Sequence, residues 1–332
     1  LVTGLLITTA TRNIDRRWVL MFFSVLQIIS SMMVAFAGSL EFLLLGRLLL
    51  GIAIGGFWSM STATTMRLVP AAMVPKALAI IFSAVSIATV VAAPLGSYFG
   101  ALIGWRNVFL ICALPSVVAL LWQLWVLPSM RPESVGSFAT LFKVLRRPGM
   151  IGGMLATILI FSGHFAFFTY LRPFLETVAQ ASVEGVSLIL LGFGVANFIG
   201  TSIAGHLLAR SLRLTLALVP LAMSVLALMM VTFGHVALLD GLLVAMWGFA
   251  FGLVPVGWST WLATTVPDEA ESAGGLLVAS IQLAISAGAA GGGAVFDLNG
   301  ASGVFVGSGV LLVSAMVIVL FAVRVKPVVS EE

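Results

Sequence analysis

Long apolar stretches, separated by short polar connections, recur along almost the whole chain. Each runs to about 20 residues, which is enough to cross about 30 Å of hydrocarbon as an α-helix. We therefore predict ten membrane-spanning helices. They cover residues 18–37, 40–64, 77–101, 105–127, 150–170, 183–208, 215–234, 237–264, 273–297 and 302–323.

The first residues, 1–11, are also apolar but reach only about 16 Å as a helix. No basic region leads them, which argues against a signal peptide. We interpret them as the end of a truncated helix.

Composition supports the membrane interpretation. Of the 332 residues, 61% are hydrophobic and 8% are charged, whereas soluble proteins keep roughly a quarter of their residues charged. The chain is therefore predicted to be an all-α polytopic membrane protein. Its single cysteine, Cys112, lies inside an apolar run and leaves no disulfide within the chain.

The basic residues alternate between the two sides of the predicted helices. Of the 16 Lys and Arg residues, thirteen fall in one set of connections, two in the other, and Arg47 within a span. The richer set is expected in the cytoplasm, and this explains the net charge of +4 without a nucleic-acid partner. The predicted cytoplasmic segments are 12–17, 66–76, 128–149, 209–213, 265–272 and the C-terminus.

The longest connection, residues 128–149, divides the chain into two parts. We predict a truncated N-terminal bundle over residues 1–127, a C-terminal bundle over 150–323 and a cytoplasmic tail over 324–332. Six spans follow the connection, whereas four and a fragment precede it. If the halves are equivalent, about one and a half helices are missing at the N-terminus.

Within this connection, the sequence SFATLFKVLRRPG favours a short amphipathic helix at the membrane surface. Its apolar residues recur at i, i+3, i+4 and i+7, with a capping Ser before them and Pro-Gly after them. A plain solvated linker is the alternative. The predicted apolar face consists of Phe138, Leu141, Phe142 and Leu145, with Ser137 as the cap.

An internal repeat supports the equivalence of the halves. GIAIGGFWSMSTATTMRLVP begins at Gly51, and GFAFGLVPVGWSTWLATTVP begins at Gly248. Both contain two glycines four apart, then Trp-Ser, then Ala-Thr-Thr, and both end in Pro. Two repeated bundles around a central cleft are typical of transporters.

Small residues recur every four positions in three spans, which predicts faces where helices approach closely. Pro94 interrupts one face and is predicted to kink its helix. Arg47 leads another face: it takes part in coupling or conformational exchange, or it snorkels to the outer interface. The three faces are Arg47, Gly51, Gly55 and Ser59; Ala84, Ala88, Ala92, Gly96 and Gly100; and Ser280, Ala284, Gly288 and Gly292.

These motifs resemble the major facilitator superfamily along the whole chain. GRLLLGIAIGG is similar to the motif of that family's fourth helix, and AAPLGSYFG to the antiporter motif of its fifth. TRNIDRRWVL resembles the loop motif after the second helix, but only Asp15 and Arg16 match, so strong gating by this loop is not expected. The resemblance implies twelve helices in two six-helix bundles. It also implies conformational roles for Asp15, Arg16, Arg47, Gly51, Gly55, Pro94 and Gly96.

Within the superfamily, the chain most resembles bacterial purine ribonucleoside efflux pumps of the drug-proton antiporter branch. GGFWSMSTATTMRLVP, FFTYLRPF and LVPVGWSTW carry this likeness. It implies a monomeric inner-membrane antiporter that exports a small neutral solute, purine ribonucleosides first, against proton entry. The alternatives are efflux of sugars such as arabinose or of drugs, and a receptor or assembly factor that does not transport.

His164 is the titratable side chain, besides Arg47, that lies well inside a span. It either carries the coupling proton or is a neutral histidine hydrogen-bonded between helices. Aromatic and amide side chains suit a flat, uncharged ligand, although each Trp could equally pack against lipid. The candidate substrate-binding residues are Trp58, Phe168, Tyr170, Asn197, Trp258 and Gln282.

The sequence offers no support for enzyme activity, a cofactor or a metal site. H-E-x-x-H and the nucleotide-binding P-loop pattern do not occur in it. GASG at Gly300 resembles a serine-protease motif, but a catalytic serine needs a nearby histidine, and these glycines fit a turn between helices better. The expected partners are a small-molecule substrate, protons and membrane lipid.

Overall fold

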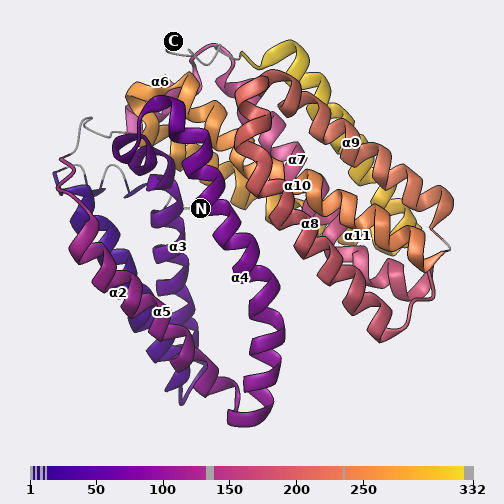
Figure 1. Cartoon of the computed structure of the whole chain (residues 1–332), viewed down its shortest axis with the longest axis horizontal. Coiled ribbons are helices and arrows are strands. Elements are labelled where there is room, and N and C mark those ends of the chain that lie inside the picture. Colours follow the sequence, from indigo (N-terminus) through magenta and orange to yellow (C-terminus); the bar gives the residue numbers. More distant parts are fainter. Residues whose placement is uncertain are drawn as a thin grey trace.

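The computed structural model describes residues 3, 6–7, 10–11, 13–131, 138–234 and 236–324, and within helices it leaves a few side chains undescribed. The predicted cap Ser137 and part of the predicted tail lie outside these residues, as do the side chains of Pro94 and Phe138. Figure 1 shows the arrangement of the helices.

All ten predicted spans are helical. In the described chain, the helices are α2 (Arg16–Ala35), α3 (Leu40–Leu68), α4 (Val74–Ile103), α5 (Trp105–Val126), α6 (Phe138–Leu145), α7 (Met150–Thr177), α8 (Val183–Arg210), α9 (Leu212–Phe233), α10 (Ala237–Thr265) and α11 (Ala270–Ala322). Two short 3₁₀ turns, η1 (Ala71–Met73) and η2 (Pro267–Glu269), precede α4 and α11.

The last two predicted spans form a single α11 with a break at Gly300. This glycine has φ +66° and ψ −171°, a combination that an L-residue with a side chain adopts only under strain. The helix therefore turns where the sequence places GASG, and the two spans lie on either side of the turn.

Polar side chains set several of the helix starts. Asp15 accepts a hydrogen bond from the backbone N–H of Arg17 at the start of α2, and Ser39 accepts one from Phe42 at the start of α3. Ser182 does the same for α8. Because the first turn of a helix has unpaired N–H groups, these caps fix the boundaries between spans and connections.

The helices form two bundles, as Figure 1 shows. Helices α2 to α5 pack against one another in the first half, and α7 to α11 pack against one another in the second. Stacked aromatic rings fill the core of the second half: Phe167 lies 3.7 Å from Trp247 and 4.4 Å from Phe305 between ring centroids.

Helix α6 packs at one end of the second half, against α7 and α11. Of its described side chains, Leu141 and Val144 are buried, whereas Phe142 is 64% exposed. The predicted apolar face is therefore shifted: Val144 belongs to it and Phe142 points outward, because the core of the second half fixes which side of α6 is covered. Below, "the α6 end" means this end of the molecule.

The two halves approach each other at the α6 end and diverge toward the opposite end (Figure 1). Helix α4 packs against α8, and α3 packs against α11. A close approach joins Gly274 to Ser59: a Cβ atom on Gly274 would lie 2.2 Å from the Ser59 carbonyl oxygen. Small residues allow this contact, as they do between membrane helices generally.

The small-residue faces have different surroundings. Gly288 and Gly292 pack against α7, where added Cβ atoms would lie 2.4 Å from the Ser162 oxygen and 2.9 Å from the Tyr170 ring. Apart from the surrounding backbone of α4 itself and the adjacent residues, no described atom lies within 4 Å of such an atom on Gly96 or Gly100. The face on α11 is thus a seam inside the second half, whereas this part of α4 lies apart from the other half.

Candidate functional site

A cavity of about 200 Å³ lies between the two halves. It is bounded by α3 and α4 of the first half and by α7, α10 and α11 of the second. Among the described residues, its lining includes Ile54, Trp58, Ser61, Thr62, Phe82, Phe161, Pro255, Ser259, Leu277, Ile281 and Gln282.

The first half supplies a flat aromatic wall to this cavity. Trp58 on α3 stacks on Phe82 on α4, with ring centroids 5.2 Å apart and planes 15° from parallel. The Phe57 ring meets the Trp58 ring edge-on. Pairing with neighbouring rings holds the indole in place, so its face suits a flat ring system.

The second half supplies hydrogen-bonding groups. Gln282 on α11 lines the cavity together with Ser259 on α10. An amide both donates and accepts hydrogen bonds, as a hydroxyl does. An aromatic wall facing an amide and hydroxyls can bind a flat, uncharged molecule that has polar edges.

Three further predicted binding residues lie away from this cavity lining. Trp258 is only 1% exposed and packs edge-on against Trp261 at 5.3 Å. Tyr170 donates a hydrogen bond to the Ala289 carbonyl at 3.3 Å, within the seam between α7 and α11. Phe168 packs against both His164 and Phe193. The structure thus brings Trp58 and Gln282 together and separates these three from them.

Asn197 joins the two halves. Its Oδ1 accepts a hydrogen bond from Ser86 on α4 at 2.7 Å, and its Nδ2 donates to the Gly248 carbonyl on α10 at 3.1 Å. The Ser86 hydroxyl also lies 3.3 Å from Thr201. With its amide used in this way, Asn197 ties α4, α8 and α10 together at the seam.

His164 lies inside the second half and is only 3% exposed. Its Nδ1 accepts a hydrogen bond from Trp247 Nε1 at 3.0 Å. Its ring stacks on Phe251 at 3.3 Å, with planes 3° from parallel. Since the indole N–H can only donate, Nδ1 has no proton and the imidazole is neutral.

An ion-pair network closes the α6 end. Arg16, at the start of α2, binds Glu271, at the start of α11, through both oxygens of the carboxylate, with Nε to Oε1 at 2.8 Å. Arg67 at the end of α3 reaches the same carboxylate at 3.2 Å. The Arg16 and Glu271 side chains are 2% and 7% exposed. A bidentate buried pair of this kind is the strong form of the interaction, and here it joins the two halves. We call these three residues the latch.

The remaining predicted motif residues support or flank this arrangement. Asp15 accepts hydrogen bonds from Ser129 and from the Met130 backbone N–H, which holds the loop beside Arg16. Desolvation raises the pKa of this partly buried carboxyl, but the hydrogen bonds from Ser129, Met130 and Arg17 outweigh it and hold the pKa below its usual value. Arg47 is exposed, and its guanidinium lies 5.1 Å from the centre of the Phe109 ring on α5. Gly51 is also exposed, whereas Gly55 is buried.

Sequence reasoning missed two features of the site. Phe82 and Phe161 line the cavity, but each is one apolar residue in an apolar helix, and no local signal distinguishes them. Glu271 lies in the segment 265–272, which the sequence analysis predicts only to be cytoplasmic. The signal that could have found it is an acidic residue just before the predicted span 273–297, on the same side as the basic connections.

Comparisons with known proteins agree with this architecture. The Major Facilitator Superfamily matches residues 1–289. The purine ribonucleoside efflux pump NepI of Salmonella enteritidis PT4 is 46% identical over 325 residues, which is 98% of this chain and 82% of the relative. NepI of Salmonella typhimurium strain LT2 has the same identity and coverage.

Two solved structures share the fold. The human organic anion transporter MFSD10 (TETRAN) superposes with a TM-score of 0.81 at 19% identity, over 95% of this chain and 80% of that one. The proton:xylose symporter XylE superposes with a TM-score of 0.78 at 18% identity, over 95% and 82%. The two bundles, the repeated glycine motifs and these matches lead to one conclusion: the chain belongs to the Major Facilitator Superfamily.

Proposed function

We propose that this chain is a proton-coupled antiporter of the bacterial inner membrane that exports purine ribonucleosides. The observation that carries the proposal is the 46% identity over 98% of the chain to proteins named purine ribonucleoside efflux pumps. The cavity supports it, because a purine is flat, uncharged and polar at its edges.

The roles of the cavity residues follow from this substrate. The base stacks on Trp58 in the plane set by Phe82. Gln282 and Ser259, which line the cavity from the second half, hydrogen-bond to the base edge or to the ribose hydroxyls. Aromatic stacking binds any base, so discrimination between purines rests on the amide and hydroxyl groups.

The latch gives the conformational half of the mechanism, so Arg16 takes part in gating although the partial match of its loop motif predicted no strong role. With the α6 end toward the cytoplasm, as the basic connections predict, the Arg16–Glu271 pair closes the cytoplasmic side. Release of this pair opens the cavity to the cytoplasm for loading. The halves then rock about the α4–α8 seam, as alternating access requires.

His164 is a candidate for carrying the coupling proton. Its surroundings instead support the alternative prediction, a neutral histidine that is hydrogen-bonded between helices. A neutral imidazole stacked on Phe251 and bonded to Trp247 has no route for a proton through those neighbours. We propose that it holds α7 against α10, and that the coupling proton binds elsewhere.

Transport in inverted membrane vesicles tests the proposal. Vesicles containing the chain are given labelled inosine and an interior-acid pH gradient, with and without a protonophore. Uptake that needs the gradient and stops with the protonophore is the expected result.

Other outcomes separate the alternatives. Gradient-driven uptake of arabinose or of a cationic dye, without inosine uptake, would keep the antiporter and replace its substrate. Absence of uptake for all three would favour a receptor or assembly factor on a transporter fold.

A further inference from the structure

Helices α4 and α8 form a surface groove of about 570 Å³ along the seam between the two halves. Apolar residues make up most of its described lining, with Ile80 and Ile87 of α4 65% and 49% exposed. Phe198 lines it from α8. The groove is therefore open, apolar and shared by both halves.

The groove faces away from the central cavity. Phe82 lines the cavity, whereas Ile80 lines the groove. Two residues correspond to about 200° around an α-helix, so these side chains point in nearly opposite directions. Because the cavity lies between the halves, the groove faces the surrounding lipid.

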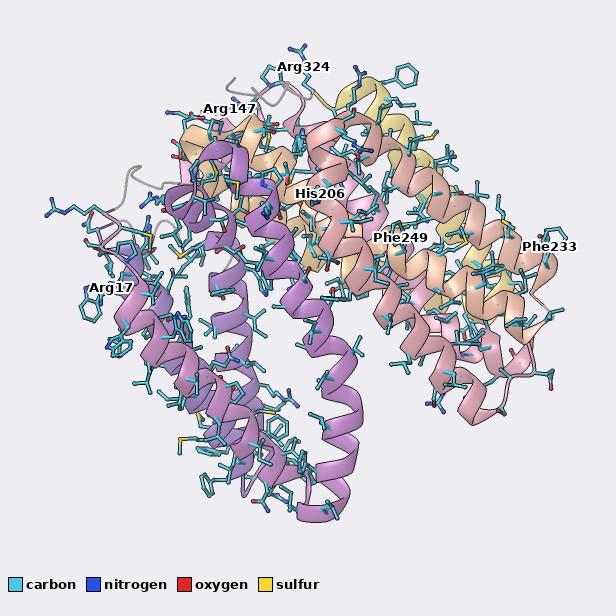
Figure 2. The ribbon with its side chains drawn as sticks, in the orientation of Figure 1. Arg17, Arg147, His206, Phe233, Phe249 and Arg324 are labelled. Carbon is cyan, nitrogen blue, oxygen red and sulfur yellow. The ribbon has the colours of Figure 1, made fainter. Side chains whose placement is uncertain are left out.

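Cationic and N–H donor groups stand at the α6 end of the groove. Lys76 of α4 and His206 of α8 both line it, and Figure 2 labels His206 where the two halves meet near the α6 end. The helices are close here, since a Cβ atom on Gly205 would lie 3.3 Å from the Lys76 Cα. None of the described residues that line the groove carries a carboxylate.

The length of the groove matches one membrane leaflet. From Lys76 to Ile87, α4 rises about 16 Å, and half of the hydrocarbon core is about 15 Å. Ser83 and Ser202 lie partway along, with their hydroxyls 3.1 Å apart, so their polar atoms satisfy each other. The remaining surface is suited to an acyl chain.

We propose that this groove binds one anionic phospholipid. The phosphate lies between the Lys76 ammonium and the His206 imidazole, and an acyl chain follows Ile80 and Ile87. Since the two headgroup contacts come from different halves, the bound lipid stabilises the arrangement that is closed at the α6 end. The complementary charge of the headgroup, rather than the apolar area alone, selects the ligand.

Lipid retention tests the proposal on the full chain. The protein is reconstituted in nanodiscs of phosphatidylcholine with increasing phosphatidylglycerol, and the lipids retained after transfer to detergent are counted by native mass spectrometry. We expect one phosphatidylglycerol to be retained in preference to phosphatidylcholine. Lys76→Gln should weaken this retention about fivefold, and Lys76→Gln with His206→Gln should weaken it further.

A matched control removes the same charge from the same end. Lys143 lies on α6 and is exposed, so Lys143→Gln should leave retention unchanged. Equal retention of both lipids by the wild-type protein, or unchanged phosphatidylglycerol retention in the double variant, would overturn the proposal.

A second groove, of about 820 Å³ on α8, α9 and α10, has Arg210 among its lining residues and lies within one half. If Arg210→Gln abolished retention and the double variant did not, the lipid would occupy that groove and the proposal would fail. Retention involves no transport step, so this result is independent of which substrate the protein exports.

Discussion

The α6 end and the opposite end of the molecule differ in what joins the two halves. At the α6 end, the Arg16–Glu271 pair, the Ser59–Gly274 contact and the α4–α8 seam connect them. The seam extends from Lys76 beside Gly205 to Val90 beside Gly194. Beyond Val90, α4 continues through Gly96 and Gly100, which have no described neighbour within 4 Å of an added Cβ atom.

This difference shows that the contacts between the halves are concentrated at one end. Each half is held together by its own helix packing, since most contacts fall within the halves. The junction between them, by contrast, rests on the charged latch, a few close glycine contacts and the α4–α8 seam. Such a junction can be broken without unfolding either bundle, which is what a rocking transporter needs.

The largest effect is expected from breaking the latch. Glu271→Gln removes the negative charge opposite buried Arg16, and breaking a buried pair costs about 3–5 kcal/mol. The α6 end should open more often. A cysteine at Ser61, which lines the cavity, in a Cys112→Ser background should react faster with an impermeant maleimide added from the α6 side.

The opposite end supplies the control for this variant. Glu176 pairs with Arg172 in an exposed i,i+4 ion pair, which contributes about 0.3–0.5 kcal/mol. Glu176→Gln should leave the labelling rate unchanged. Equal labelling in both variants would show that the latch does not hold the α6 end closed.

A smaller effect is expected from Gly274→Val. Its Cβ atom would lie 2.2 Å from the Ser59 carbonyl oxygen, so α3 and α11 must separate, at a cost of about 1–3 kcal/mol. The same labelling assay should show increased access from the α6 side. Gly100→Val, at the end without such contacts, should change labelling little. A comparable increase in that variant would show that the contacts between the halves are not concentrated at the α6 end.

Trp58→Leu sharpens a second comparison, between the two copies of the internal repeat. Loss of stacking should weaken nucleoside binding by about 1–3 kcal/mol, raising the KM for inosine efflux. Trp258→Leu should instead lower the thermal stability, because this side chain is buried against Trp261. A raised KM in the Trp258 variant at unchanged stability would place both tryptophans at the substrate.

The smallest effect on transport is expected from His164→Gln. A glutamine oxygen can still accept the Trp247 hydrogen bond, so uphill efflux should stay within about twofold of wild type, with some loss of thermal stability from the lost stacking. The measurement is efflux under a pH gradient in inverted vesicles. Loss of uphill efflux with intact inosine binding would instead assign the coupling proton to His164.

Hydrophobic spacing was enough to predict every span. The helices require only apolar residues over a membrane's thickness, and Gly300, flanked by apolar runs, marked the break inside α11. The apolar face of α6 was harder, because its periodicity allows either Phe142 or Val144 to be covered. The neighbouring bundle decided in favour of Val144.

The repeat shows most directly where sequence reasoning reaches its limit. Trp58 and Trp258 each begin a Trp-Ser pair that precedes Ala-Thr-Thr by the same spacing, yet one lines the cavity and the other is buried in its own half. Local sequence could not separate them, since the difference arises from Phe82 on one side and Trp261 on the other.

The sequence by itself determined the membrane class, the helices, the two halves and the likeness to a transporter family, because these depend on composition, periodicity and motifs along the chain. Only the tertiary structure decided which side chains share the cavity, that His164 accepts a hydrogen bond from Trp247, and that Glu271 binds an arginine 255 residues away. The physical reason is that an apolar helix can pack on any of its sides, and only its neighbours select the side that is covered.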